Sequence, residues 1–237
     1  MGKTFSIFKK EAFGYLTSPL AYVFIATFLL ISGYTFWAIL LESRQAHLRE
    51  TFEVLSSLLL FLTPMLTMRL LSEEKKSGTI ELLFTSPLSP LHIVLGKFLA
   101  CFCVFLVIFT FTLAYPVTVY TFGSPDIWPI VGGYIGLLLL AACYTSIGLL
   151  ASALSENQLI SVVLSFAMLL FFWMIYWAKD FIRNAFFSSL VRNLSFLEHF
   201  EGFGKGIVSL PDVIYFLSFI SLCIFLSGKI LELQRNK

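Results

Sequence analysis

Residues 128–154 read WPIVGGYIGLLLLAACYTSIGLLASAL, and residues 159–178 read LISVVLSFAMLLFFWMIYWA. Neither run contains a charged residue, and only the polar turn SENQ at 155–158 separates them. A helix needs about 20 mostly apolar residues to cross the hydrocarbon core of a bilayer. Two such runs joined by a short polar turn predict two consecutive membrane-spanning helices.

The rest of the chain supplies four more runs of spanning length, at residues 20–41, 54–71, 92–122 and 213–231. The run at 54–71 is interrupted by Pro64 and carries Arg69 near its end. The run at 92–122 is longer than a span needs, which predicts a tilt or an extension into water. The sequence therefore predicts an all-α integral membrane protein with six transmembrane helices, in a single domain over residues 1–237.

The composition agrees with this fold class. Hydrophobic residues make up 58% of the 237 residues and charged residues only 13%, against about 25% charged in a typical soluble domain. The net charge of +2 is too small to indicate nucleic acid as a partner. All four cysteines lie in apolar runs, which favours buried hydrophobic side chains over disulfides or a metal site; they are Cys101, Cys103, Cys143 and Cys223.

Charge and hydropathy also predict how the chain meets the membrane surface. Most of the 16 Lys and Arg residues fall on one side if both termini are cytoplasmic, which favours that orientation. Apolar residues at helical spacing predict a helix over 3–17 lying in the cytoplasmic interface, with an extension of the first span as the alternative. Its predicted apolar face is formed by Phe5, Phe8, Ala12, Phe13 and Leu16, and Ile7 falls off it. The aromatic-rich stretch 179–212 predicts an outer loop with short amphipathic helices.

The loop after the second span reads SEEKKSGTIELLFTSPLSP at residues 72–90. Ser77 and Gly78 can begin a short helix, and Pro87 ends it because proline disfavours helix in the residue before it. A short helix over 77–87 that carries apolar residues and one acid can dock in a groove of a partner. A solvated loop whose charges follow the positive-inside rule is the alternative, and these residues alone leave both open.

The order of several motifs resembles the membrane subunit of ABC-2 type exporters. The pattern Glu-Glu-x-x-x-Gly-Thr-Ile-Glu-Leu-Leu-x-Thr-Ser-Pro occupies 73–87, and Leu-Gly-Lys follows at 95–97. Near the start, Lys-Lys-Glu at 9–11 precedes Ser-Pro-Leu-Ala-Tyr at 18–22. Ser-Glu-Asn-Gln at 155–158 and Phe-Leu-Glu-His-Phe-Glu at 196–201 resemble the subgroup related to gliding-motility and copper-processing permeases.

The resemblance implies a half-transporter in the bacterial inner membrane. Its coupling helix would sit on a separate ABC ATPase, present in two copies, and a second permease subunit, identical or related, would face it. A periplasmic or membrane accessory protein and membrane lipids are further implied partners. The implied ATPase-coupling residues are Glu73, Glu74, Gly78, Thr79, Glu81, Leu82, Leu83, Ser86 and Pro87. The implied gate or cytoplasmic-contact residues are Glu156 and Asn157, and those of an outer cap formed by re-entrant helices are Phe196, Glu198, His199, Phe200 and Glu201.

For two of these sets the residues favour plainer interpretations. Glu156 also fits a solvated turn, while Glu198, His199 and Glu201 also fit anchors at the membrane surface. The pair Gly132-x-x-x-Gly136 permits close helix contact, within the bundle or at a dimer face.

Catalytic chemistry is sparse in the sequence. A P-loop would read G-x-x-x-x-G-K-[ST], and Gly2-Lys3-Thr4 is only its tail. No cofactor is therefore expected in this chain, and ATP and Mg are expected in the partner ATPase. An intramembrane protease is a weak alternative, because Glu73-Glu74 lacks the histidines that would have to share its water. A channel or secondary transporter is the remaining alternative, although the predicted spans carry few ionisable residues in their centres.

Overall fold

The computed structural model describes residues 2–43, 47–81, 88–178 and 191–235, and within these ranges the chain is helical and contains no strand. Six helical segments are long and apolar enough to cross a membrane. They are α2 (Pro19–Ser43), α3 (Arg49–Thr67), α6 (Pro90–Thr112) with α7 (Ala114–Phe122), α8 (Ile127–Leu154), α9 (Gln158–Ala178) and α12 (Leu210–Arg235). The shorter helices are α1 (Gly2–Thr17), α4 (Ser72–Lys76) and α11 (Phe196–Gly204). The predicted all-α fold with six spans is confirmed.

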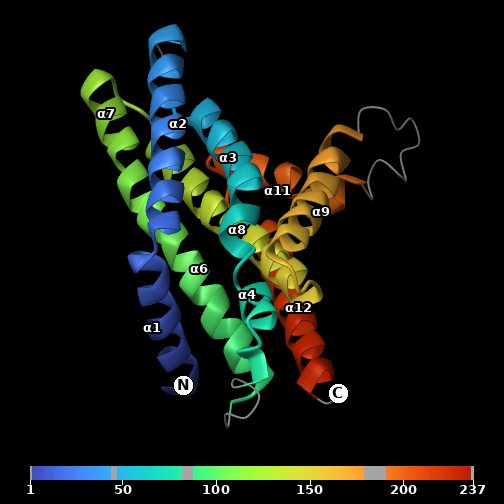
Figure 1. The fold of residues 1–237 in the computed structure, drawn as a ribbon. Helices are drawn as coiled ribbons and strands as arrows, with labels where there is room; N and C mark the ends of the chain where they lie inside the picture. Colours follow the sequence, from blue (N-terminus) through green and yellow to red (C-terminus); the bar gives the residue numbers. More distant parts are fainter. Residues whose placement is uncertain (1, 44–46, 82–87, 179–190, 236–237) are drawn as a thin grey trace.

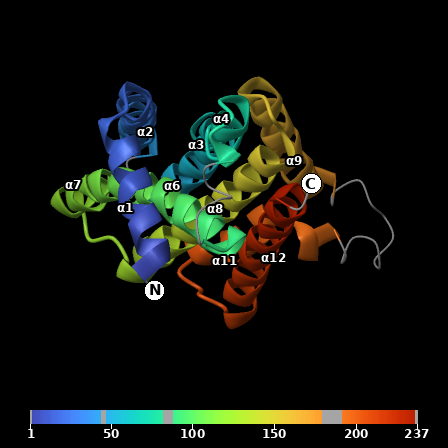
Figure 2. The ribbon, with the colours of Figure 1, turned by 60° about the horizontal axis from the view of Figure 1, so that its bottom comes forward.

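Helix α8 lies at the centre of the bundle and packs against α3, α6, α9, α11 and α12. Figure 1 shows both termini and α4 at one end of the bundle, which we call the termini end. Figure 2, in which that end comes forward, shows α12 on one side of α8 and α3 with α4 on the other. Both termini therefore lie on the same side of any membrane that the six helices cross.

Small residues on α8 allow its neighbours to approach closely. A Cβ atom on Gly133 would lie 2.1 Å from Cε2 of Phe52, and one on Gly148 would lie 2.1 Å from Oγ1 of Thr67. Both contacts bring α3 against α8. Within its most apolar window, α8 is 78% buried, whereas α2 and α9 are 22% and 17% buried. Helices α2 and α9 thus expose most of their apolar surface, as expected of helices that face lipid or another subunit.

The third span is broken, which differs from the predicted continuous run at 92–122. The helix α6 ends at Thr112, and α7 begins two residues later at Ala114. Proline lacks a backbone N–H and its ring clashes with the carbonyl four residues earlier, so Pro116 frees the carbonyl of Thr112. The phenol of Tyr134 on α8 donates a hydrogen bond to that carbonyl at 2.7 Å. A side chain of another span thus replaces the missing helical bond.

The second span begins earlier than the predicted residue 54. Helix α3 starts at Arg49, which forms an ion pair with Glu53 one turn later at 3.5 Å. Phe52 is 2% exposed and packs edge-on against Tyr134, so the first turn is packed against α8. After Thr67 the chain makes a turn and enters α4 at Ser72.

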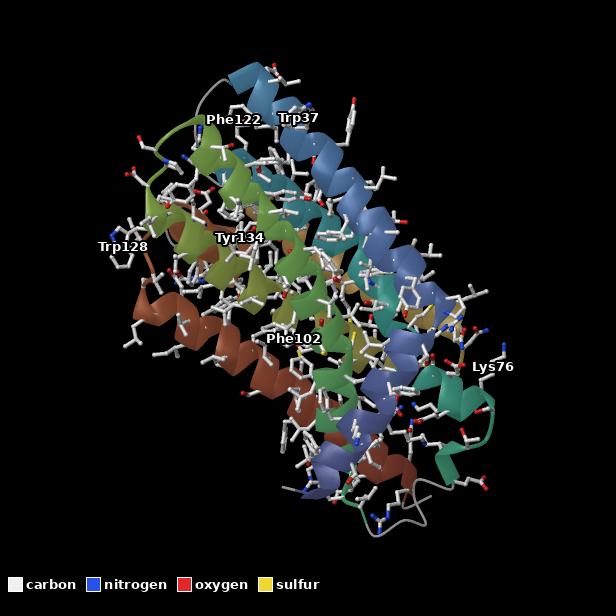
Figure 3. All side chains as sticks on the ribbon, turned by 90° about the vertical axis from the view of Figure 1, so that its left-hand side faces the viewer. Trp37, Lys76, Phe102, Phe122, Trp128 and Tyr134 are labelled. Carbon is white, nitrogen blue, oxygen red and sulfur yellow. The ribbon has the colours of Figure 1, made fainter. Side chains whose placement is uncertain are left out.

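Helix α1 leaves the direction of α2 at Ser18 and crosses α6 (Figure 3). Ile7, which the prediction places off the apolar face, packs on α6. A Cβ atom on Gly96 would lie 2.7 Å from Cγ2 of Ile7. Phe5 and Phe13 are instead 64% and 69% exposed. One stripe of α1 therefore contacts protein and another is free to contact lipid.

Candidate functional site

The charged segment after the second span lies at the termini end (Figure 1). Helix α4 spans Ser72–Lys76 and places two acids in its first turn and two bases in its last. This order favours a helix, because acids stabilise the positive N-terminal end of the helix dipole and bases the negative C-terminal end. Even so, a helix of five residues is too short to be stable alone. Its position must therefore come from contacts with the spans around it.

One side of α4 is fixed by a buried lysine on α6. Nζ of Lys97 lies 2.8 Å from Oε1 of Glu74 and 3.3 Å from Oε1 of Glu11 on α1. Lys97 is 2% exposed, so the pair of carboxylates supplies the charge that a buried ammonium requires. Oε2 of Glu74 is also buried and has no hydrogen-bond partner among the described residues. A single ammonium group thus joins α1, α4 and α6.

The other side of α4 is fixed to the last turn of α8. Oγ of Ser152 accepts hydrogen bonds from the backbone N–H groups of Leu71, at 2.9 Å, and of Ser72, at 3.0 Å. The ammonium group of Lys75 donates to the backbone carbonyl of Ala153. A helix leaves its first N–H groups without partners, and Ser152 supplies an acceptor for two N–H groups at the start of α4. Any shift of α4 would therefore strain hydrogen bonds to α8, the central helix.

The chain reverses direction after α4. Gly78 adopts φ +72°, a left-handed conformation that side chains with a Cβ atom disfavour. Oγ of Ser77 and Oγ1 of Thr79 lie 2.8 Å apart across this turn. Ile80 and Glu81 are helical, and Glu81 is exposed. The other implied coupling residues, Leu82, Leu83, Ser86 and Pro87, lie outside the described residues.

The turn between α8 and α9 contains the two candidate gate residues. Oδ1 of Asn157 accepts a hydrogen bond from the backbone N–H of Leu159 at 2.9 Å, and this bond caps the start of α9. Glu156 is exposed and interacts electrostatically with Lys75 of α4. Asn157 therefore has a local structural role, and Glu156 belongs to the surroundings of α4.

Toward the opposite end, the residues of the implied outer cap form α11 and pack on α8. Phe196 and Phe200 are 2% and 4% exposed. Phe196 packs against the ring of Phe172 on α9, with ring centroids 4.6 Å apart, and against that of Phe219 on α12, 4.9 Å apart. A Cβ atom on Gly136 would lie 2.7 Å from Cβ of Phe203 on α11. The two glycines of Gly132-x-x-x-Gly136 therefore serve packing within this chain.

The polar residues of α11 have partners inside the chain. Nδ1 of His199 lies 2.6 Å from Oδ1 of Asp212 on α12, and its ring stacks on Tyr215 with centroids 4.0 Å apart. Glu198 pairs with Arg192 at 2.9 Å. Glu201 accepts a hydrogen bond from the phenol of Tyr176 on α9. These contacts fix α11 to its neighbours, and the interpretation of these residues as anchors at the membrane surface stays a prediction.

The three histidines lie on different segments of the fold. His92 lies in the first turn of α6 and contacts Ser89 at the termini end. His47 precedes α3 and lies near Glu50, and His199 lies on α11. Within the described part of the chain, no hydrogen bond or ion pair joins a histidine to Glu73 or Glu74.

Four residues that fix these two regions were not identified from the sequence as site residues: Lys97, Glu11, Ser152 and Asp212. Lys97 was noted only as part of the Leu-Gly-Lys motif. A signal existed, because a lysine after a glycine at the start of a long apolar helix has to find a nearby carboxylate. Ser152 carried no such signal, since a serine in an apolar helix usually bonds to its own backbone.

Six apolar helices of membrane-spanning length, with α8 at their centre and a charged segment tied to α6, α8 and the shorter α1, define a multi-pass α-helical membrane protein. A model of the ABC-2 family transporter proteins matches residues 5–237. Because this match covers nearly the whole chain, the chain belongs to the ABC-2 transporter family, whose members are membrane permeases of ABC transporters. No curated protein matches the chain.

Proposed function

We propose that this chain is the permease subunit of an ATP-driven exporter of the ABC-2 type. A separate ABC ATPase, present in two copies, would bind the segment from Glu73 to Pro87 on the cytoplasmic side of a bacterial inner membrane. ATP and Mg would be bound by that ATPase. A second permease subunit, identical or related, would complete the pathway, and its surface would meet the exposed apolar faces of α2 and α9.

The two-sided attachment of α4 carries this proposal. Lys97 ties α4 to α1 and α6, and Ser152 ties it to α8. A force applied by a partner at the exposed turn around Gly78 would reach these three helices through short, directional contacts. A loop that only solvated its charges would not need a buried lysine and a shared serine to fix its position.

The motifs at 155–158 and 196–201 support the finer placement in the subgroup related to gliding-motility and copper-processing permeases. The outer loop at 179–212 is the proposed contact for a periplasmic or membrane accessory protein. The substrate is exported or extracted from the membrane, and its chemical class is left open.

The test is assembly with the ATPase after two substitutions in the exposed turn. Gly78→Pro cannot adopt φ +72°, because proline fixes φ near −65°. Glu81→Lys reverses one exposed charge. We expect either variant to lower recovery of the ATPase in native-membrane purification, and to lower stimulated ATP hydrolysis, by about tenfold or more, as for the loss of a central interface residue.

The matched control is Glu232→Lys, because Glu232 is also an exposed acid at the termini end, on α12. Size-exclusion profiles would show that each variant folds. Wild-type assembly in well-folded Gly78→Pro and Glu81→Lys proteins would contradict the proposal. Recovery of the wild-type chain without any ATPase, together with ion conductance in liposomes, would instead indicate a channel.

A further inference from the structure

An open cleft of about 300 Å³ lies at the termini end, between α1 and the stretch that joins α3 to α4. It is lined by Lys10, Glu11, Gly14, Tyr15, Ser18, Arg69 and Glu73. The phenol of Tyr15 donates a hydrogen bond to the carbonyl of Leu66 at 3.3 Å and so closes one wall. A Cβ atom on Gly14 would meet nothing within 4 Å. The cleft therefore has rigid sides and free space between them.

The depth of the cleft corresponds to the headgroup layer of a bilayer. Ser18 directly precedes Pro19, where the first membrane span begins. Arg69 follows the end of α3 at Thr67. Apolar spans end and charged residues collect where the hydrocarbon core meets the lipid phosphates. A molecule bound here would thus be level with lipid headgroups.

Arg69 is one of the two cations that line this cleft. Its Nε atom is buried and has no hydrogen-bond partner among the described residues. A buried N–H group without an acceptor costs free energy, so a shift of the Arg69 side chain that brought this group to a bound anion would be favourable. Guanidinium groups bind phosphate oxygens well, because their N–H groups form a planar fork. Lys10, also in the cleft wall, adds a second cation at an exposed position.

An unpaired acid shares the cleft with these cations. Glu73 is exposed and forms no ion pair with Arg69, although both line the cleft, and within the described part of the chain it pairs with no other cation. The other acid, Glu11, is already paired with Lys97 at 3.3 Å. Burial raises the pKa of the Tyr15 phenol well above its ordinary value, so this wall adds no negative charge. The cleft is thus lined by the cations Arg69 and Lys10 and by the acid Glu73, and Glu73 forms no ion pair with them.

We propose that this cleft binds the headgroup of a zwitterionic aminophospholipid. The phosphate would bind Arg69 and Lys10, and the primary ammonium group would bind Glu73. The volume is at the lower limit of roughly 300–1,000 Å³ for small-molecule sites, which suits a headgroup whose acyl chains stay in the bilayer. The proposal concerns this chain alone and does not depend on the ATPase.

The test measures lipid binding to the full-length chain in detergent by native mass spectrometry. The probes are phosphatidylethanolamine, phosphatidylglycerol and phosphatidylcholine with identical acyl chains. We expect the wild-type chain to prefer phosphatidylethanolamine by about tenfold, as for one charge-assisted hydrogen bond. Soluble phosphoethanolamine should compete with the lipid, and inorganic phosphate should compete much less.

Two variants separate the two charges of the headgroup. Arg69→Gln should weaken binding of all three lipids about tenfold, because each carries the phosphate. Glu73→Gln should remove the preference for phosphatidylethanolamine and leave phosphatidylglycerol binding unchanged. The matched controls are Lys76→Gln and Glu81→Gln, which alter exposed residues outside the cleft wall and should bind as the wild type does. Figure 3 shows Lys76 pointing away from the bundle.

Melting curves of each variant would show that lost binding is not lost folding. Equal affinity for the three lipids, or a preference for phosphatidylglycerol, would overturn the proposal. Competition by inorganic phosphate as strong as by phosphoethanolamine would also overturn it and indicate a free-anion site. Unchanged binding in a folded Arg69→Gln variant would place the lipid elsewhere on the chain.

Discussion

At the termini end, α4 is held by hydrogen bonds and ion pairs, whereas toward the opposite end α11 combines polar contacts with aromatic rings packed on glycine. Hydrogen bonds and ion pairs are directional, and they weaken steeply when the geometry changes. Apolar packing is non-directional and roughly proportional to buried area. A small displacement therefore changes the energy at the termini end more sharply, as a region that relays force to the spans requires.

The first prediction removes the charge on which the termini end depends. Lys97→Met leaves two carboxylates, Glu11 and Glu74, without their cation. We expect the free energy of unfolding to fall by about 3–5 kcal/mol, the usual cost of breaking a buried ion pair from one side. The shift in apparent melting temperature in detergent measures this loss, and adding Glu74→Gln should recover part of it.

The control for this change is Lys229→Met, which breaks an exposed ion pair with Glu232 on α12. Exposed pairs contribute about 0–1 kcal/mol. Similar melting temperatures for the Lys97 and Lys229 variants would contradict the contrast between a buried and a surface pair.

The second prediction tests the packing toward the opposite end. Gly136→Ala would place a methyl group 2.7 Å from Cβ of Phe203. Overpacking of this kind costs about 1–3 kcal/mol, so the melting temperature should fall while stimulated ATP hydrolysis per folded protein stays unchanged. The matched control is Gly204→Ala on α11, where a Cβ atom would meet nothing within 4 Å. A loss of hydrolysis without a loss of stability would show that α11 also transmits force.

The third prediction has the smallest effect on stability and the most specific effect on coupling. Ser152→Ala removes the acceptor of two backbone N–H groups at the start of α4. We expect a loss of about 1–2 kcal/mol, because buried donors lose their partner, together with weaker stimulation of the ATPase. Ser155→Ala is the control, since the hydrogen bond of Oγ of Ser155 within the described residues goes to the carbonyl of Ala151 in the last turn of α8. Equal losses of stability and of ATPase stimulation in the two variants would show that Ser152 does not attach α4 to α8.

The sequence was sufficient for the spans because hydropathy reports directly on them. The uncharged runs at 128–154 and 159–178 correspond to α8 and α9 almost residue for residue. The break at Leu113 was not predicted. A proline such as Pro116 is tolerated in a span when another group bonds to the carbonyl that it frees, and here that group is the phenol of Tyr134. That partner comes from another helix, and its position depends on tertiary packing.

The candidate site was predicted in part for the same reason. The motif containing Glu73 and Glu74 marked the segment, since its charges interrupt an apolar pattern. Which groups those charges meet could not be read from one chain. Glu74 meets Lys97, 23 residues away, and His199 meets Asp212, 13 residues away. The contact of Ile7 with Gly96 was not predicted, because the small size of Gly96 matters only once the two helices cross.

The bond from Tyr134 to Thr112 has a consequence for the order in which the protein is made. Residues up to 122 leave the ribosome before Tyr134 does, so the freed carbonyl of Thr112 has no partner when the third span first enters the membrane. An unpaired carbonyl in hydrocarbon is costly. We therefore expect the third span to reach its final position only when the fourth span arrives beside it, so that the two complete their insertion as a pair.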